Sequence, residues 1–185
     1  MSLAAKIKSG EFVVLGEFEP PKGADFSRLL KNARQIKGRV DAVMVPEMGN
    51  AVMKASSLGG CAFLKGHGIE TVFQVCCRDR NRLALQADIL SAAALGIPNI
   101  MAVPGEEITY GDHPQARLVN DLNLIELLET IQKLKNGKDM AGIELNGTPG
   151  FCTGSTVNAG ALGGVMDIEM QNLNKMINLG VEFLI

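Results

Sequence analysis

The chain repeats one pattern along its length: a short apolar segment rich in β-branched residues, followed by a stretch with helical spacing of apolar residues. Strict alternation of strand and helix is typical of a parallel sheet whose strands are joined by right-handed crossovers. The pattern predicts an α/β fold of about six strands and five helices. We predict strands at residues 12–19, 41–45, 71–77, 99–103, 140–145 and 181–185, with helices at residues 26–37, 51–65, 80–95, 121–134 and 167–179.

Two architectures accommodate such an order, a doubly wound open sheet and a (β/α)8 barrel. The open sheet usually carries a Gly-rich phosphate-binding turn after its first strand, and the sequence there is EPPKG, not GxGxxG. A barrel has eight strands and typically about 250 residues. We therefore predict a parallel (β/α)8 TIM-type barrel, here incomplete, with residues 1–185 as one partial barrel domain lacking the C-terminal strands and helices.

The first strand, FVVLGEFEPPKG, carries two carboxylates into a double proline. Strand side chains alternate between faces, so Glu17 and Glu19 share one face with Leu15. Pro20 and Pro21 cannot donate to a sheet ladder and end the strand. Both acids are therefore expected at the C-terminal end of the strand, where parallel barrels hold their active sites.

Composition narrows the partners that the chain can have. A formal net charge of -2 gives no reason to expect nucleic acid or a membrane surface as a partner. No apolar run approaches the roughly 18 residues that span a bilayer, and the first ten residues contain no secretory segment. The four cysteines have no CxxC spacing, and the two histidines stand alone, so we expect no metal site. These features indicate a cytoplasmic protein with reduced thiols.

Several segments resemble methylenetetrahydrofolate reductases, the flavin-dependent TIM barrels of one-carbon metabolism. GEFEPPK is similar to the FEFFPPK opening of that family, and DAVMVPEMGNAVMKASSLGGCAFLK resembles its second strand and helix. CRDRNRLALQADILSAAALGI resembles a form common among its bacterial and archaeal members. GDHPQA and the helix before GVEFLI fit as well, so the resemblance runs from about residue 12 to residue 185.

The resemblance implies a role for individual residues. Glu17 falls on the catalytic acid, which helps to protonate the folate N10 and open the methylene bridge. Gln74 falls where the family places a His or Gln against the flavin. Gly105 and Glu106 fall on a Gly-Asp pair whose acid lies near the flavin ring and the folate.

Three further positions are implied to contact the flavin. Asn146, at the end of the expected fifth strand, falls among flavin-contacting positions, and Glu169 and Asn172 fall near the ribityl and phosphate end.

The chain also departs from the family pattern at four positions. Pro46 stands where the second strand usually has a Thr, and Cys76 where a Thr is usual on the third strand. The LTGD or LRGD motif reads VPGE, with Pro104 removing a backbone N–H. Met176 stands where a lysine would pair with the flavin phosphate, with Lys175 next to it.

The activity that the resemblance implies is reduction of 5,10-methylenetetrahydrofolate to 5-methyltetrahydrofolate. The implied cofactor is FAD, with FMN or no flavin as alternatives, and the electron donor is NAD(P)H or a partner electron carrier. A homo-oligomer or hetero-complex is expected. The alternative is a diverged, non-catalytic paralogue that acts as a partner subunit of a redox or methyl-transfer complex.

Two other segments stand out. Residues 106–121 form a long connection of the kind that is often functional. Arg78, Asp79, Arg80 and Arg82 form a charge cluster at the start of a helix, and a local ion-pair network is its simplest interpretation.

Overall fold

The computed structural model describes all residues from Met1 to Ile185 and contains one six-stranded sheet. The strands are β1 (Leu15–Glu17), β2 (Ala42–Val45), β3 (Thr71–Cys76), β4 (Asn99–Val103), β5 (Cys152–Ser155) and β6 (Phe183–Leu184). The α-helices are α1 (Leu3–Ser9), α2 (Ser27–Ile36), α3 (Ser57–Gly66), α4 (Arg82–Ala94), α5 (Leu124–Lys135) and α6 (Gly164–Asn178). Two 3-10 turns, η1 (Gly49–Ala51) and η2 (Ile108–Tyr110), lie in the loops after β2 and β4.

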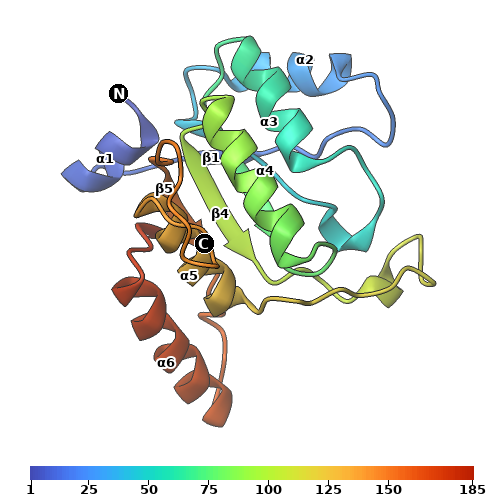
Figure 1. Cartoon of the computed structure of the whole chain (residues 1–185). Coiled ribbons are helices and arrows are strands. Elements are labelled where there is room, and N and C mark those ends of the chain that lie inside the picture. The colour runs from blue at the N-terminus through green and yellow to red at the C-terminus, as the bar shows by residue number, and fades with distance from the viewer.

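The strands lie in the order of the sequence, and each pairs in parallel with the next. Helices that are consecutive from α3 to α6 contact one another, so they form a layer along the outside of the curled sheet (Figure 1). The two ends of the sheet, β1 and β6, do not pair with each other. The fold is thus an incomplete α/β barrel of TIM type, as predicted.

Apolar side chains fill two layers on opposite faces of the sheet. The larger cluster, between strands and helices, contains Val43, Phe73 and Ile100, which alternate with residues of the inner cluster. The inner cluster holds Leu3, Ala42, Met44, Val72 and Met101. Val13 and Leu15 pack against the inner cluster and Phe18 against the outer one, which confirms the predicted alternation along the first strand.

The predicted fifth strand at residues 140–145 is wrong. This segment is a turn in which Ile143 N–H donates to the Asp139 carboxylate at 2.8 Å, and Gly142 takes a φ of +86°. The fifth strand is β5, which lies between the segment predicted as a strand and the predicted helix at residues 167–179. Gly154 leaves room there for the ring of Phe183, since a Cβ would lie 2.2 Å from the ring. Close packing rather than side-chain pattern therefore selects this strand.

The starts of α3 and α5 differ from the prediction because other side chains cap these helices. The helix expected from residue 51 begins only at α3, where the Ser56 hydroxyl accepts from Gly59 N–H at 3.1 Å. The helix expected from Asp121 begins at α5, where Asn123 and Glu126 form a reciprocal capping box. Asp121 instead accepts hydrogen bonds from Arg82.

Helix α1, which the sequence did not predict, closes the N-terminal end of the sheet. Leu3 is fully buried in the inner cluster, and its backbone N–H donates to Glu70 at 2.9 Å. The same Glu70 oxygen accepts from the Asn99 amide at 3.2 Å, so α1 is tied to the starts of β3 and β4. The opposite, C-terminal end of the sheet stays open.

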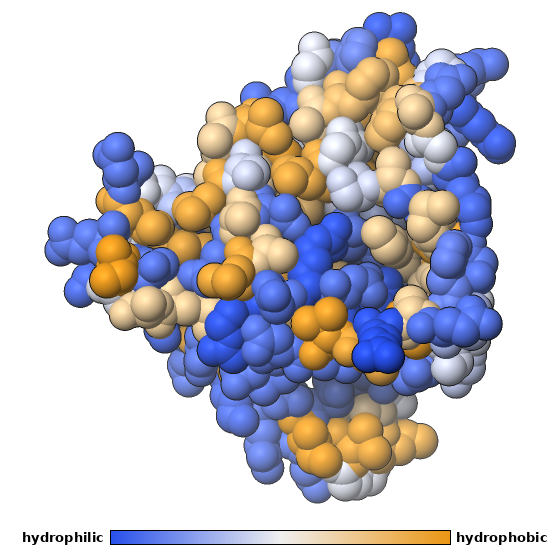
Figure 2. Space-filling model, turned by 45° about the vertical axis from the view of Figure 1, so that its right-hand side comes forward, coloured by the Kyte–Doolittle hydropathy of each residue, from blue (hydrophilic) through white to orange (hydrophobic).

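Helix α6 carries exposed apolar side chains along much of its length. Figure 2 shows apolar side chains gathered at the lower end of the molecule, where α6 lies in Figure 1. The exposed residues are Val165, Ile168, Met170 and Ile177. No helix has the length and apolar character needed to cross a bilayer.

The burial of Leu3 gives a test of the closed end. Leu3→Ala should lower the free energy of unfolding by about 2–5 kcal/mol, since it removes buried methyl groups and leaves a cavity. Urea denaturation measures this change. Phe12→Ala is the control, because Phe12 is 87% exposed, and should change stability by no more than about 0.5 kcal/mol. An equal effect of both substitutions would contradict the docking of α1.

Candidate functional site

A cavity of about 490 Å³ opens at the C-terminal ends of the strands. Its floor is formed by inward-facing side chains of β2 and β4, and its rim by the loops that follow β1, β2 and β4. The lining residues are Glu17, Glu19, Met44, Pro46, Glu47, Met48, Gly49, Asn50, Gln74, Arg78, Met101, Val103, Pro104, Gly105, Glu106, Thr156 and Ile185. The structure thus brings together four of the predicted site residues: Glu17, Gln74, Gly105 and Glu106.

Four glutamates line the cavity, and the charges of two of them, Glu19 and Glu106, act on the carboxyl of Glu17. Glu17 ends β1, and its side chain reaches solvent through the cavity. Partial desolvation, followed by the charges of Glu19 and Glu106, raises the pKa of Glu17 above its ordinary value. Glu19 forms an ion pair with Lys54. Glu17 therefore binds a proton more readily than an isolated glutamate, as a proton donor requires.

The loop after β4 is fixed by Arg78, whose side chain is only 4% exposed. Its guanidinium donates to both oxygens of Asp79 and to the Glu106 carbonyl at 3.2 Å. Gly105 has a φ of +87°, and a Cβ there would lie 2.5 Å from Cys76 Sγ. Only glycine fits this conformation and this contact, so Gly105 shapes the loop that presents Glu106.

Gln74 points into the cavity from β3, and its side-chain oxygen accepts from Glu47 N–H at 3.2 Å. Glu47 itself was not among the predicted site residues. Its carboxylate is 1% exposed and is held by Arg80 and by Ser57 N–H. The available sequence signal was an acidic residue at a strand end, ten positions before a serine that opens a helix.

Three of the predicted positions do not line this cavity. Asn146 follows the turn at residues 139–143 and lies beside α4, with Leu90 and Ala93. Glu169 and Asn172 lie on α6, where a Glu169 oxygen accepts from Asn158 N–H at 3.4 Å. Met176, on the same helix, is buried in the outer core.

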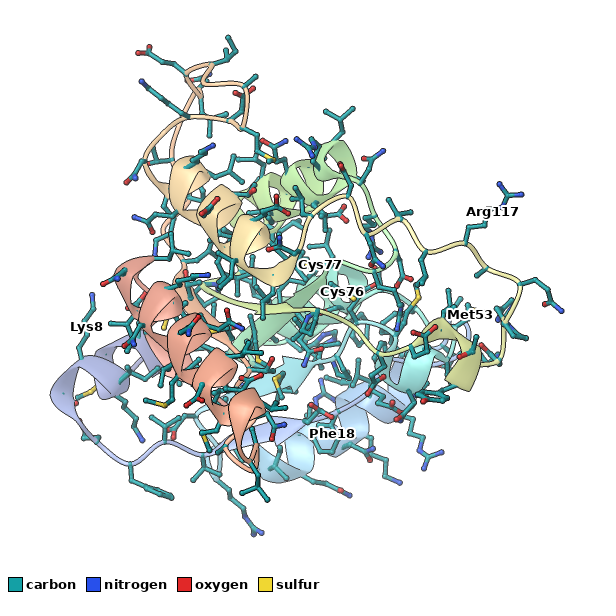
Figure 3. All side chains as sticks on the ribbon, turned by 90° about the horizontal axis from the view of Figure 1, so that it is seen from below. Lys8, Phe18, Met53, Cys76, Cys77 and Arg117 are labelled. Atoms are coloured by element: carbon teal, nitrogen blue, oxygen red, sulfur yellow. The ribbon has the colours of Figure 1, made fainter.

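Residues 106–121, which we call the strap, cross over the loops at the open end of the sheet. The Asp112 carboxylate accepts from Met53 N–H at 2.9 Å and pairs with Lys22. Gly111 packs against Ala51 so closely that a Cβ would lie 1.8 Å from the Ala51 carbonyl oxygen. Figures 1 and 3 show η2 of the strap beside the loop after β2, and Arg117 projecting away from the body.

The charge cluster at the start of α4 is a network of ion pairs, as predicted. Arg78 pairs with Asp79, and Arg80 pairs with both Glu47 and Asp88. Arg82 pairs with Asp121 at the end of the strap. The network joins the loops after β2, β3 and β4.

The like charges around Glu17 predict a measurable coupling. Glu19→Gln should lower the pKa of Glu17, because it removes a carboxylate that stabilises the protonated form. The wild-type carboxyl should then bind its proton at a higher pH than the carboxyl in the variant. A ¹³C NMR titration of the Glu17 carboxyl measures both values. Glu107→Gln is the control, and a pKa that is the same in all three proteins would refute the coupling.

The contacts of Asp112 predict that this residue holds the strap. Hydrogen bonds from Lys22 and from Met53 N–H hold the pKa of the Asp112 carboxyl well below its usual range, so this group is charged. Asp112→Asn removes that charge and the ion pair with Lys22. Trypsin should then cleave after the exposed Arg117 several times faster than in the wild type. Asp25→Asn, on another loop, should leave the rate unchanged. No increase in cleavage with Asp112→Asn would show that other contacts hold the strap.

The chain has distant similarity to solved structures. Dihydrodipicolinate synthase from Thermotoga maritima shares 12% sequence identity with it, with a TM-score of 0.45 over 80% of this chain and 46% of that one. The chain thus spans less than half the length of that enzyme. No curated protein matches the chain at a significant level.

The match to a family model covers more of the chain than the match to that structure. The family model described as methylenetetrahydrofolate reductase matches residues 2–185, which include β1 with Glu17 and the cavity at the open end of the sheet. Since the match covers nearly the whole sequence, the chain belongs to the methylenetetrahydrofolate reductase family.

Proposed function

We propose that the cavity is the site of flavin-dependent reduction of 5,10-methylenetetrahydrofolate to 5-methyltetrahydrofolate. The observation that carries the proposal is Glu17, a carboxyl at the end of β1 whose pKa is raised by desolvation and by two neighbouring acids. Family membership supports a methylenetetrahydrofolate reductase-like oxidoreductase. The proposal goes beyond family membership because it names the reaction, the proton donor and the cofactor.

The residues around the cavity suit the ring system of a flavin. Met44 and Met101 give the floor apolar side chains, and Val103 and Ile185 extend it. Gln74 offers a polar side-chain group at the wall. Apolar walls with a few fixed polar groups are the usual composition of a cofactor site. A bound flavin would supply a hydride to the folate carbon.

In the proposed reaction, Glu17 donates a proton to the folate N10. The protonated nitrogen leaves the methylene carbon, which becomes an iminium able to accept a hydride. Glu19 and Glu106 assist by favouring the protonated form of Glu17 before the transfer. Glu106 also lies at the rim, where a carboxylate can hold the folate.

The proposed cofactor is FAD, and FMN would bind the same wall through its ring. The proposed electron donor is NAD(P)H or a partner electron carrier. Glu169 and Asn172 remain proposed contacts for the ribityl and phosphate end of the flavin. Lys175, which is exposed beside the buried Met176, is the one cationic side chain on α6.

One feature favours the competing proposal of a non-catalytic partner subunit. Pro46 and Pro104 both line the cavity, and neither has a backbone N–H to offer a flavin. A visible spectrum separates the two proposals. Yellow protein that is bleached by reductant and reoxidised by methylenetetrahydrofolate supports the enzyme. Colourless protein that takes up no added FAD or FMN would exclude it.

Replacing the acid should separate the two halves of the reaction. Glu17→Gln should lower folate reduction by about 10²–10⁴-fold, because the amide cannot donate the proton. Electron transfer from NADH to a dye should stay at the wild-type rate, since that half needs no folate acid. Stopped-flow assays measure both rates, with Glu107→Gln as the control. Equal loss of both rates would contradict the role of Glu17 as the folate acid.

A further inference from the structure

The hydrogen bond between Glu47 and Gln74 fixes which end of an amide faces the cavity. The backbone N–H of Glu47 can only donate, so the group of Gln74 that faces it at 3.2 Å must be the oxygen Oε1. The Nε2 group is therefore the half of the side chain that is left for a ligand. Gln74 is 9% exposed, and the cavity is the space that its side chain borders.

The Glu47 carboxylate is held in place by two groups. One carboxylate oxygen accepts from Ser57 N–H at 2.7 Å, and the other accepts from Arg80 at 2.9 Å. The Ser57 hydroxyl in turn accepts from Gln74 N–H at 3.0 Å and donates to the Val45 carbonyl. These bonds join the end of β2, the start of α3 and the middle of β3 in one buried network.

The charged side chains around the cavity differ from Gln74 in what they offer a ligand. Their donors are used within the protein, or they can only accept hydrogen bonds when ionised. The Arg78 guanidinium donates to Asp79 and to the Glu106 carbonyl. Glu17 and Glu19 present carboxylates, which accept when they are ionised. Asn50 and Thr156 also line the cavity, but no hydrogen bond within the protein fixes their side chains, so Gln74 is the neutral donor whose orientation is set.

We infer that Glu47 is a positioning residue, which fixes the side-chain amide of Gln74 as a hydrogen-bond donor to the cavity. The site then selects a ring that presents an acceptor, a carbonyl oxygen or an unprotonated ring nitrogen, at this wall. The inference rests on the proposed function for the identity of that ring, a flavin. Its structural part, the orientation of Gln74 by Glu47, concerns the free protein.

The first test changes the donor and keeps the bond to Glu47. Gln74→Glu retains an oxygen for Glu47 N–H and, when ionised at pH 8, offers the cavity only an acceptor. Gln74→Met removes both functions. FAD binding, followed by quenching of flavin fluorescence at pH 8, should weaken at least tenfold in both variants. Wild-type affinity in Gln74→Glu would overturn the donor role.

The second test removes the support of Glu47. Glu47→Gln keeps the shape of the side chain and loses the charge that holds Arg80 and Ser57. Asp88→Asn is the matched control, because Asp88 pairs with the same Arg80 at 3.0 Å and makes no bond to Glu47 or Gln74. FAD affinity should fall severalfold in Glu47→Gln and stay unchanged in Asp88→Asn. Glu47→Gln combined with Gln74→Met should bind no worse than Gln74→Met alone. Additive losses would show that Glu47 acts independently of Gln74.

The third test needs no ligand and separates this inference from the proposed function. The ¹⁵N heteronuclear NOE of the Gln74 side-chain amide, assigned by its absence in Gln74→Met, should be as high as that of the backbone in the wild type and in Asp88→Asn. In Glu47→Gln it should fall toward the value of the exposed Gln115. An unchanged NOE in Glu47→Gln would refute the positioning role, even if the wild type bound no FAD and the proposed function had failed.

Discussion

The parallel register of the first four strands is the constraint on which the site depends. Glu17 pairs with Met44, and Met44 pairs with Val72. Gln74 lies two residues after Val72 and pairs with Met101, so Glu17 and Gln74 stand on the same inner face in successive rows of the sheet. Hydrogen bonds between neighbouring strands set this register, and a shift of one residue would turn the side chains of the shifted strand to the other face of the sheet. Glu17 and Gln74 therefore face the same cavity because the backbone ladder places them there.

The sequence predicted the parts of the fold that depend on local pattern. Five strands and the helices that alternate with them follow from apolar spacing, and so does the face on which Glu17 lies. The segment CTGS became a strand against its composition, because Gly154 leaves space for Phe183 across the pair with β6. A contact between residues 29 positions apart has no local signature, and the nearby MAGIEL segment had the stronger apolar pattern.

The candidate site was predictable to a similar extent. Glu17 was expected at a strand end, where parallel barrels concentrate their functional groups. Gln74, Gly105 and Glu106 were implied by the resemblance to a known family. Glu47 was missed because its importance comes from partners that lie ten and 33 positions away along the chain. Asn146 was assigned through the wrong strand, so the structure places it beside α4 rather than at the cavity. Residues that touch a ligand directly leave short motifs, whereas residues that hold them in place do so through distant contacts.

The contact between Gly111 and Ala51 has a consequence for how the opening of the cavity can change. The strap and the loop after β2 touch with no space for even one additional carbon atom, and Ala51, Asn50 and Met48 already adopt left-handed backbone conformations there. Neither loop can move toward the other without a clash, and the hydrogen bond from Met53 N–H to Asp112 resists their separation, so we expect the two loops to move together. A change of substrate size in related proteins would then require matched changes in both loops, and substitutions confined to one of them should be poorly tolerated.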